Sequence, residues 1–147
     1  ERDKEISKFR QKTVTVIDSI TRLDKGKSNS SIYRTIIEEA NQLSELHAAN
    51  KSEVVYTDLF ENTSAFSIYN AYDRALLKKH PDSICKRLEH IVKPGNLKGI
   101  HIYLIYRPKT PKDNEYFILM SALFKSILEA KGAQVSIGAN LVEKQTE

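Results

Sequence analysis

The sequence predicts an α/β fold, a three-layer sandwich of Rossmann-like type with a mostly parallel sheet of about four strands. Two apolar runs rich in β-branched residues, at 12–18 and 53–58, are typical of strands buried on both faces. A segment of helical periodicity separates them, so the two strands are expected to run parallel. A third apolar run, at 100–106, precedes another helical segment. Right-handed crossovers are then expected to place helices on both faces of the sheet.

The first half of the chain is assigned from apolar spacing and turn residues. Residues 1–11 are charged and are expected to form a flexible lead-in or a short helix. The polar stretch 19–30 follows the first strand and is expected to be a loop. A helix is predicted over 31–47, because its apolar residues recur at helical spacing. The candidates for its N-cap are Ser28, Asn29 and Ser30.

The middle of the chain predicts two helices separated by a proline. After the strand at 53–58 and a short loop, a helix is expected from Ser64 to Lys79, with Ser64 or Thr63 as its N-cap. Pro81 interrupts it. A second helix, capped by Asp82, is expected to continue through Val92.

The last third alternates strand and helix again. The strand at 100–106 is followed by 108–114, a polar stretch with two prolines that is expected to be a loop. A long helix is predicted over 115–131, and Gly132 suits the left-handed residue after its end. A fourth strand is predicted at 134–137. We therefore expect one domain over 12–141, followed by a polar tail at 142–147.

Composition narrows the class of protein. The 147 residues are 40% hydrophobic and 29% charged, as in ordinary globular proteins, and no apolar stretch is long enough to span a membrane. The net charge is only +4, and no Lys/Arg-rich block is interleaved with aromatic residues, so nucleic-acid binding is not expected. The chain begins at Glu1, as after removal of a leader. The expected compartment is the cell envelope or periplasm if a leader was removed, and otherwise the cytoplasm.

Each of the first two predicted strands ends in an acidic residue. Asp18 closes the run Thr13-Val14-Thr15-Val16-Ile17, and Asp58 closes the run Val54-Val55-Tyr56-Thr57. Parallel strands bring their carboxyl ends to the same edge of a sheet, where open α/β folds usually bind ligands. The two carboxylates are therefore expected to lie together at that edge.

The order of elements resembles the von Willebrand factor A-like fold. In that family the first strand ends in an Asp that opens an Asp-x-Ser-x-Ser loop, and a later strand ends in a Thr-Asp pair. Ile17-Asp18 and Tyr56-Thr57-Asp58 stand at the matching places. The segments 99–105 and 124–137 are similar to the later part of such domains. The resemblance spans residues 12–141, and it implies protein–protein adhesion or assembly.

The matching metal loop departs from the family pattern. Members hold a divalent cation through two serine hydroxyls, a threonine hydroxyl and acidic groups. Here the loop reads Asp18-Ser19-Ile20-Thr21-Arg22, so Ile20 and Arg22 replace the two serines. The resemblance implies a degenerate site without a cofactor, in which Asp18 and Asp58 would hold any Mg²⁺ that does bind. Alternatively, the Arg22 guanidinium could take the place of the cation between the two carboxylates.

A nucleotide site is the main competing reading of the same region. Gly26-Lys27-Ser28 lies between a strand and a helix, as in a phosphate-binding loop, but Thr21 stands where the Walker pattern needs its first glycine. Phe60, just after Asp58, is expected either to staple the loop to the sheet or to form an aromatic rim for a partner.

The sequence therefore predicts a non-catalytic binding module of vWA-like type whose partner is another protein. It would use the loops 18–30, 58–64 and 107–114 at the carboxyl edge of the sheet. A small-molecule ligand stays open as well. The alternative is a small Mg²⁺-dependent hydrolase or nucleotide-binding protein that uses the Asp18/Asp58 pair. The predicted binding residues are Asp18, Ser19, Thr21, Arg22, Asp58 and Phe60.

Overall fold

The structure is a computed structural model that describes residues 4–7 and 29–140. The chain divides into two compact units, Glu1–Ser30 and Ser31–Glu147. Residues 4–7 of the first unit are helical. The expected strand at 12–18 and the tail at 142–147 lie outside the described residues, so the single domain over 12–141 stays a prediction. The second unit contains the elements that follow.

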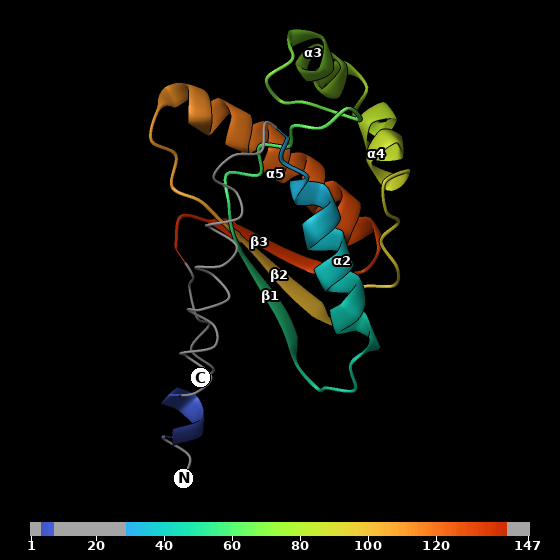
Figure 1. Cartoon of the computed structure of the whole chain (residues 1–147), viewed down its shortest axis with the longest axis vertical. Coiled ribbons are helices and arrows are strands. Elements are labelled where there is room, and N and C mark those ends of the chain that lie inside the picture. Colours follow the sequence, from blue (N-terminus) through green and yellow to red (C-terminus); the bar gives the residue numbers. More distant parts are fainter. Residues whose placement is uncertain (1–3, 8–28, 141–147) are drawn as a thin grey trace. The chain divides into compact units, whose positions relative to one another are not determined.

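Three parallel strands form the sheet of the second unit, in the order β1-β2-β3 (Figure 1). They are β1 (Lys51–Tyr56), β2 (Ile100–Ile105) and β3 (Gln134–Gly138). The first residue of each strand lies within two residues of a predicted strand start, so these three predictions are confirmed. The mixed α/β character of the fold is confirmed as well. The fourth strand stays a prediction, because its residues are not among those described.

Four helices accompany the sheet: α2 (Ile32–Glu45), α3 (Ala71–Lys79), α4 (Pro81–Glu89) and α5 (Pro111–Ala130). Figure 1 shows α2 and α5 beside one another along the same side of the sheet. The Tyr33 ring of α2 lies 6.1 Å from the Phe124 ring of α5. Ile102 and Leu104 of β2 are buried in the same core as these rings. The four helices described in the second unit thus contribute to one core on one face of the sheet.

Within the described residues of the second unit, the other face of the sheet carries no helix. Val54 and Tyr56 of β1 point to it and are 42% and 66% exposed. The His101 ring stacks on the Tyr103 ring with their centroids 4.0 Å apart, and His101 Nε2 lies 2.7 Å from Ser136 Oγ. Because the strands follow one another in one direction, right-handed crossovers place both connections on the same face. The second helical layer of a three-layer sandwich stays a prediction.

The predicted helix starting at Ser64 is wrong over its first seven residues. Residues 64–70 form an irregular loop, and α3 begins at Ala71 because the Asn70 side chain accepts hydrogen bonds from Tyr72 N and Asp73 N. Phe66 and Ile68 are both fully buried, although they are two positions apart. One helical face cannot bury such a pair, since its neighbours lie three and four positions apart.

The starts of α4 and α5, in contrast, were predicted too late. Pro81 does not merely interrupt the helix before it, since it is the first residue of α4. Pro111 likewise opens α5, four residues before the predicted start, with the Thr110 hydroxyl as its cap. Proline suits the first helical position because the N–H that it lacks would have no partner within the helix there. At the other end of α5, Gly132 has φ +96°, which confirms its predicted left-handed conformation.

Candidate functional site

Asp58 shapes a tight turn at the carboxyl end of β1. Its Oδ1 accepts a hydrogen bond of 2.9 Å from Phe60 N, and the Thr57 hydroxyl accepts one of 3.2 Å from Leu59 N. Glu61 N then donates to Leu59 O at 2.8 Å. Leu59 is fully buried and has φ +63°, a left-handed conformation that is costly for a residue with a branched side chain. The chain is therefore strained directly beside the predicted site.

We expect Asp58→Ala to lower the free energy of unfolding by about 1 kcal/mol, because Phe60 N loses its acceptor while Leu59 stays strained. Asp58→Asn is the matched control, since its side-chain oxygen can still accept from Phe60 N. Urea unfolding of the three proteins measures the difference. Equal losses in both variants would mean that the hydrogen bond of the turn is not what Asp58 contributes.

Glu61 was missed as a structural residue of this edge. Its side chain is fully buried, and its Oε2 accepts a hydrogen bond of 2.8 Å from Tyr33 N in the first turn of α2. The N-cap residue of α2 is Ser31, whose side chain makes no cap hydrogen bond. Burial raises the pKa of the Glu61 carboxyl, and the hydrogen bond from the Tyr33 backbone opposes that shift. Glu61 thus caps the N-terminal end of α2 in place of a neighbouring residue. No motif near Glu61 or near the start of α2 predicts this contact.

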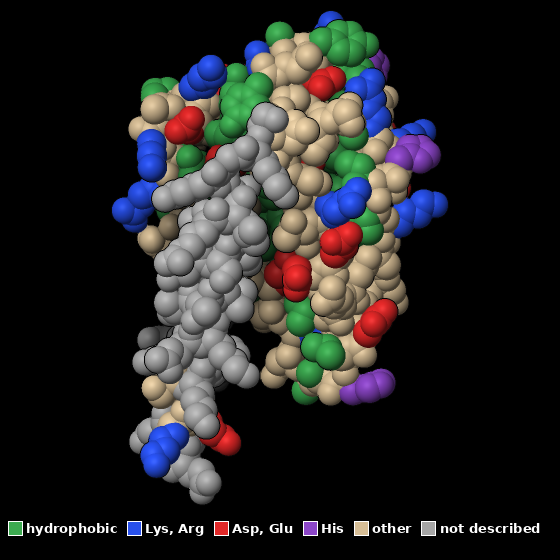
Figure 2. All heavy atoms as spheres, in the orientation of Figure 1, with side chains coloured by type: hydrophobic (Ala, Val, Ile, Leu, Met, Phe, Trp, Pro, Cys, Tyr) green, Lys and Arg blue, Asp and Glu red, His purple; other side chains and the backbone are tan. Residues whose placement is uncertain are grey.

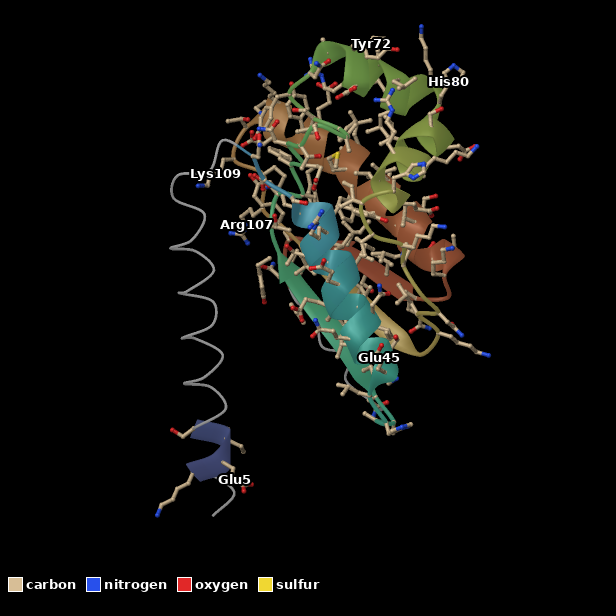
Figure 3. The ribbon with its side chains drawn as sticks, turned by 45° about the vertical axis from the view of Figure 1, so that its right-hand side comes forward. Glu5, Glu45, Tyr72, His80, Arg107 and Lys109 are labelled. Atoms are coloured by element: carbon tan, nitrogen blue, oxygen red, sulfur yellow. The ribbon has the colours of Figure 1, made fainter. Side chains whose placement is uncertain are left out.

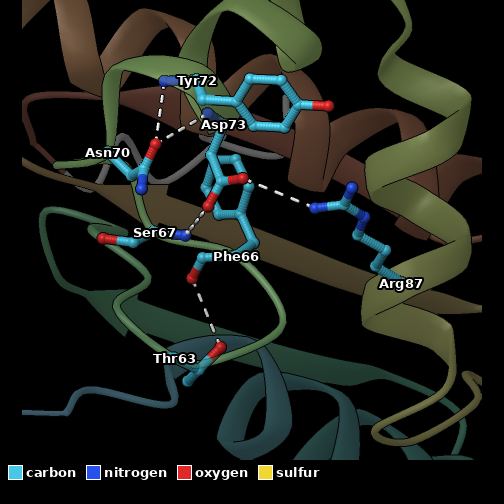
Figure 4. Close-up of polar contacts among 7 residues, drawn as sticks. All are labelled: Thr63, Phe66, Ser67, Asn70, Tyr72, Asp73 and Arg87. Carbon is cyan, nitrogen blue, oxygen red and sulfur yellow. Dashed lines mark hydrogen bonds and ion pairs between the residues drawn. The ribbon is translucent and has the colours of Figure 1, made fainter.

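The loop between the Asp58 turn and α3 is held by its own polar contacts (Figure 4). Thr63 N and the Thr63 hydroxyl both donate to Phe66 O, at 2.9 and 3.3 Å. Asp73 Oδ2 accepts from Ser67 N at 2.9 Å, while its Oδ1 lies 3.5 Å from Arg87 Nη1 of α4. Each of these contacts removes freedom from the loop, so the edge presents a pre-shaped surface.

An aromatic cluster underlies this surface. The Phe60 ring lies 6.2 Å from those of Tyr69 and Tyr106 and 5.7 Å from that of Tyr116, in edge-to-face arrangements. Phe60 is only 7% exposed, so it staples the loop to the sheet and does not form an exposed rim. Tyr69, which is 57% exposed, is the ring of this cluster that solvent reaches most.

Charged groups of both signs surround the cluster. The Arg74 guanidinium carbon lies 5.1 Å from the Tyr116 ring centroid and Lys112 Nζ 5.5 Å from it, within range of cation–π attraction. Partial burial raises the pKa of the Tyr69 hydroxyl, and the carboxylates of Asp58 and Asp113 raise it further. The two carboxylates therefore act on the same aromatic residue, although Asp58 follows β1 and Asp113 lies in the first turn of α5.

The loop before α5 adds further cations. Arg107 and Lys109 are exposed, and Figure 3 shows both pointing away from the helices on the same side of the molecule. Arg107 Nη2 donates to Asn140 Oδ1 at 3.4 Å. In the space-filling view, Lys and Arg side chains gather over the start of α5 and the loop leading into it (Figure 2).

Of the predicted site residues, the structure describes only Asp58 and Phe60. The others, Asp18, Ser19, Thr21 and Arg22, lie outside the described residues, as does the Gly26-Lys27-Ser28 stretch. The meeting of Asp18 with Asp58, and the placement of Arg22 between them, stay predictions. Within residues 4–7 and 29–140, no three His, Cys, Asp or Glu side chains are grouped to hold a metal ion.

Comparisons of the chain with protein-family models, with curated proteins and with solved structures found no match. The resemblance to the vWA-like fold therefore stays a prediction that rests on the residues quoted above. Among the helices described, none has the length and apolar character needed to cross a membrane.

Proposed function

We propose that this chain is a non-catalytic protein-binding module that uses the loops at the carboxyl edge of its sheet. The observation that carries the proposal is the exposure of the Tyr69 ring, which packs on the buried Phe60 and Tyr116 rings. Two cations, Arg74 and Lys112, lie over the Tyr116 ring. Aromatic residues that stand out from a rigid support are frequent hot spots of protein interfaces. A support that is ordered before binding lowers the entropy lost on association.

The proposal keeps the vWA-like architecture with a fourth strand at 12–18. Its support is the β-branched run itself and the entry of the chain into α2. The first turn of α2 is bonded to Glu61, which follows β1, so α2 begins at the carboxyl edge of the sheet. A strand at 12–18 that ended at this edge would feed α2 and then β1 as a regular βαβ unit. Asp18, Ser19, Thr21 and Arg22 would then belong to the binding surface, with no metal required.

Site-specific photo-cross-linking tests the binding surface. A photoreactive phenylalanine analogue at position 69 is compared with one at position 46. Leu46 is 56% exposed and is the C-cap of α2, the end of that helix away from the carboxyl edge. In extract of the producing cells, we expect a discrete adduct from position 69 and none from position 46. Excess unlabelled chain should compete the adduct away, whereas excess Tyr69→Ala should not. The same adduct from both positions would contradict the proposal.

Thermal unfolding separates this function from the enzymatic alternative. A ligand that binds only the native state raises the melting temperature. We expect no rise with Mg²⁺ or Mn²⁺, alone or with nucleotides. Stabilisation by metal alone would contradict the degenerate metal site, and stabilisation that needs metal and nucleotide together would favour the hydrolase or nucleotide-binding alternative.

A further inference from the structure

We infer that the carboxyl-edge surface binds an acidic polypeptide segment that also carries an apolar or aromatic residue. This inference rests on the proposed function and names the chemistry of its partner. It starts from four cationic side chains at this edge, which we call the basic rim: Arg74, Arg107, Lys109 and Lys112.

No ion pair among the described residues involves the basic rim. The ion pairs that the described residues form join other cations, namely Lys78 to Glu115, Arg87 to Asp73 and Lys125 to Glu129. Arg74 donates to Ile68 O at 2.8 Å and Arg107 to Asn140, so both guanidinium groups are positioned by neutral acceptors that leave their charge in place. Positioned arginines can form paired hydrogen bonds with a carboxylate.

The start of α5 adds to the positive potential. Lys112 is the second residue of this 20-residue helix, whose N-terminal end carries a partial positive charge. In its first turn, Asp113 N donates to the Thr110 hydroxyl and Asn114 N donates to Thr110 O. Pro111 has no N–H. Among the described residues, the Lys112 N–H is the amide of that turn for which no bond is found. Acidic groups of a partner are therefore favoured by side chains and backbone at the same place.

The carboxylates of the edge select a polypeptide over a nucleic acid. Asp58 accepts from Phe60 N in the turn after β1, and Asp113 follows Lys112 of the basic rim in the first turn of α5. Both carboxylates raise the pKa of the Tyr69 hydroxyl. A continuous row of phosphates laid across the rim would meet these two charges. A peptide can direct separate acidic side chains at the cations and place an apolar residue on Tyr69 between them.

Fluorescence anisotropy with a labelled peptide of repeated Glu-Glu-Phe units tests the inference on the whole chain. We expect saturable binding at low salt that weakens at high salt, because exposed charge pairs are screened. A Lys-Lys-Phe peptide of equal length should not bind, and single-stranded DNA should bind more weakly than the acidic peptide. Lys112→Glu should weaken binding of the acidic peptide about tenfold.

The matched control is Lys125→Glu. This exposed lysine lies on the same helix, about 20 Å further along, and the variant has the same net charge as Lys112→Glu. The two variants are compared at about 0.1 M salt, where the Debye length is about 10 Å. We expect the affinity of Lys125→Glu to stay within about twofold of that of the original chain, because its charge lies beyond that length. Equal weakening by both variants would show a dependence on net charge alone and would overturn the inference.

The outcomes also separate this inference from the proposed function. Absence of acidic-peptide binding, or tighter binding of DNA, overturns the acidic partner. If the adduct at position 69 still forms under those conditions, the protein-binding function stands with a partner of other chemistry. Loss of both the adduct and the peptide binding overturns both proposals.

Discussion

Replacing Glu61 with alanine is expected to lower the free energy of unfolding by about 2–3 kcal/mol at neutral pH. The change removes the acceptor of Tyr33 N in the first turn of α2 and leaves that buried amide without a partner. It also opens space in the fully buried site of the Glu61 side chain. Because α2 packs its Tyr33 against Phe124 of α5, the loss loosens the junction of two helices.

Urea unfolding of Glu61→Ala, Glu61→Gln and Ser31→Ala measures this effect. Ser31 is the N-cap residue of α2 but makes no side-chain cap bond, so its alanine variant should cost less than about 0.5 kcal/mol. Glutamine keeps an oxygen that can accept from Tyr33 N, so its loss should be less than half that of alanine. If Ser31→Ala cost as much as Glu61→Ala, the helix would be capped locally and not by Glu61.

Replacing Glu53 with glutamine is expected to stabilise the protein, and increasingly so as the pH rises. Glu53 lies in β1 beside Ile102, and its Oε2 is buried with no hydrogen-bond partner among the described residues. Burial raises the pKa of its carboxyl to about 8, and the Glu39 carboxylate adds to the shift. The native chain thus holds a proton that the unfolded chain releases near pH 4.5.

The sign of the pH dependence follows from this proton. Between pH 4.5 and 8 the native state binds more protons at Glu53 than the unfolded state, so the free energy of unfolding falls as the pH rises. Glutamine cannot ionise and removes this slope. At pH 8 we expect Glu53→Gln to be about 2 kcal/mol more stable than the original chain. A change of one unit in the pKa corresponds to about 1.4 kcal/mol, and the total is reduced because the Glu53 side chain is only partly buried.

Chemical unfolding at a series of pH values from 4.5 to 8 checks this prediction. The two proteins should have nearly equal stability at the acidic end and diverge towards the alkaline end. Glu39→Gln is the control, since it removes only the smaller, electrostatic cause of the shift and should recover a minor part of the gain. A parallel pH dependence of Glu53→Gln and the original chain would mean that Glu53 is ionised in the native state.

Periodicity predicted the regular elements well and their starts less well. The apolar runs at β1, β2 and β3 and the apolar spacing of α2 and α5 are local signals, so they could be read directly. The start of α3 could not, because Asn70 competes with Ser64 and Thr63 as a cap, and burial of Phe66 and Ile68 decides between them. The proline at the start of α5 was read as a loop residue, although proline also favours the first turn of a helix.

The function of the candidate site stays a prediction, and the structure adds contacts there that the sequence could not show. The end of β1 is a local feature, so the sequence predicted a functional role for Asp58, but the structure adds that it shapes a strained turn. The capping of α2 by Glu61 joins residues 28 positions apart, and no local pattern encodes such a contact. Tyr69, Tyr106 and Tyr116 meet Phe60 only because three separate segments end at the same edge.

The aromatic cluster at the carboxyl edge can be followed by intrinsic fluorescence. The chain has no tryptophan, and three of its seven tyrosines, Tyr69, Tyr106 and Tyr116, are in the cluster at the carboxyl edge. Part of its intrinsic ultraviolet emission therefore comes from this region. A Tyr69→Trp variant would place a single indole there. The wavelength and intensity of its emission would report changes in the solvent exposure of that edge without an attached dye.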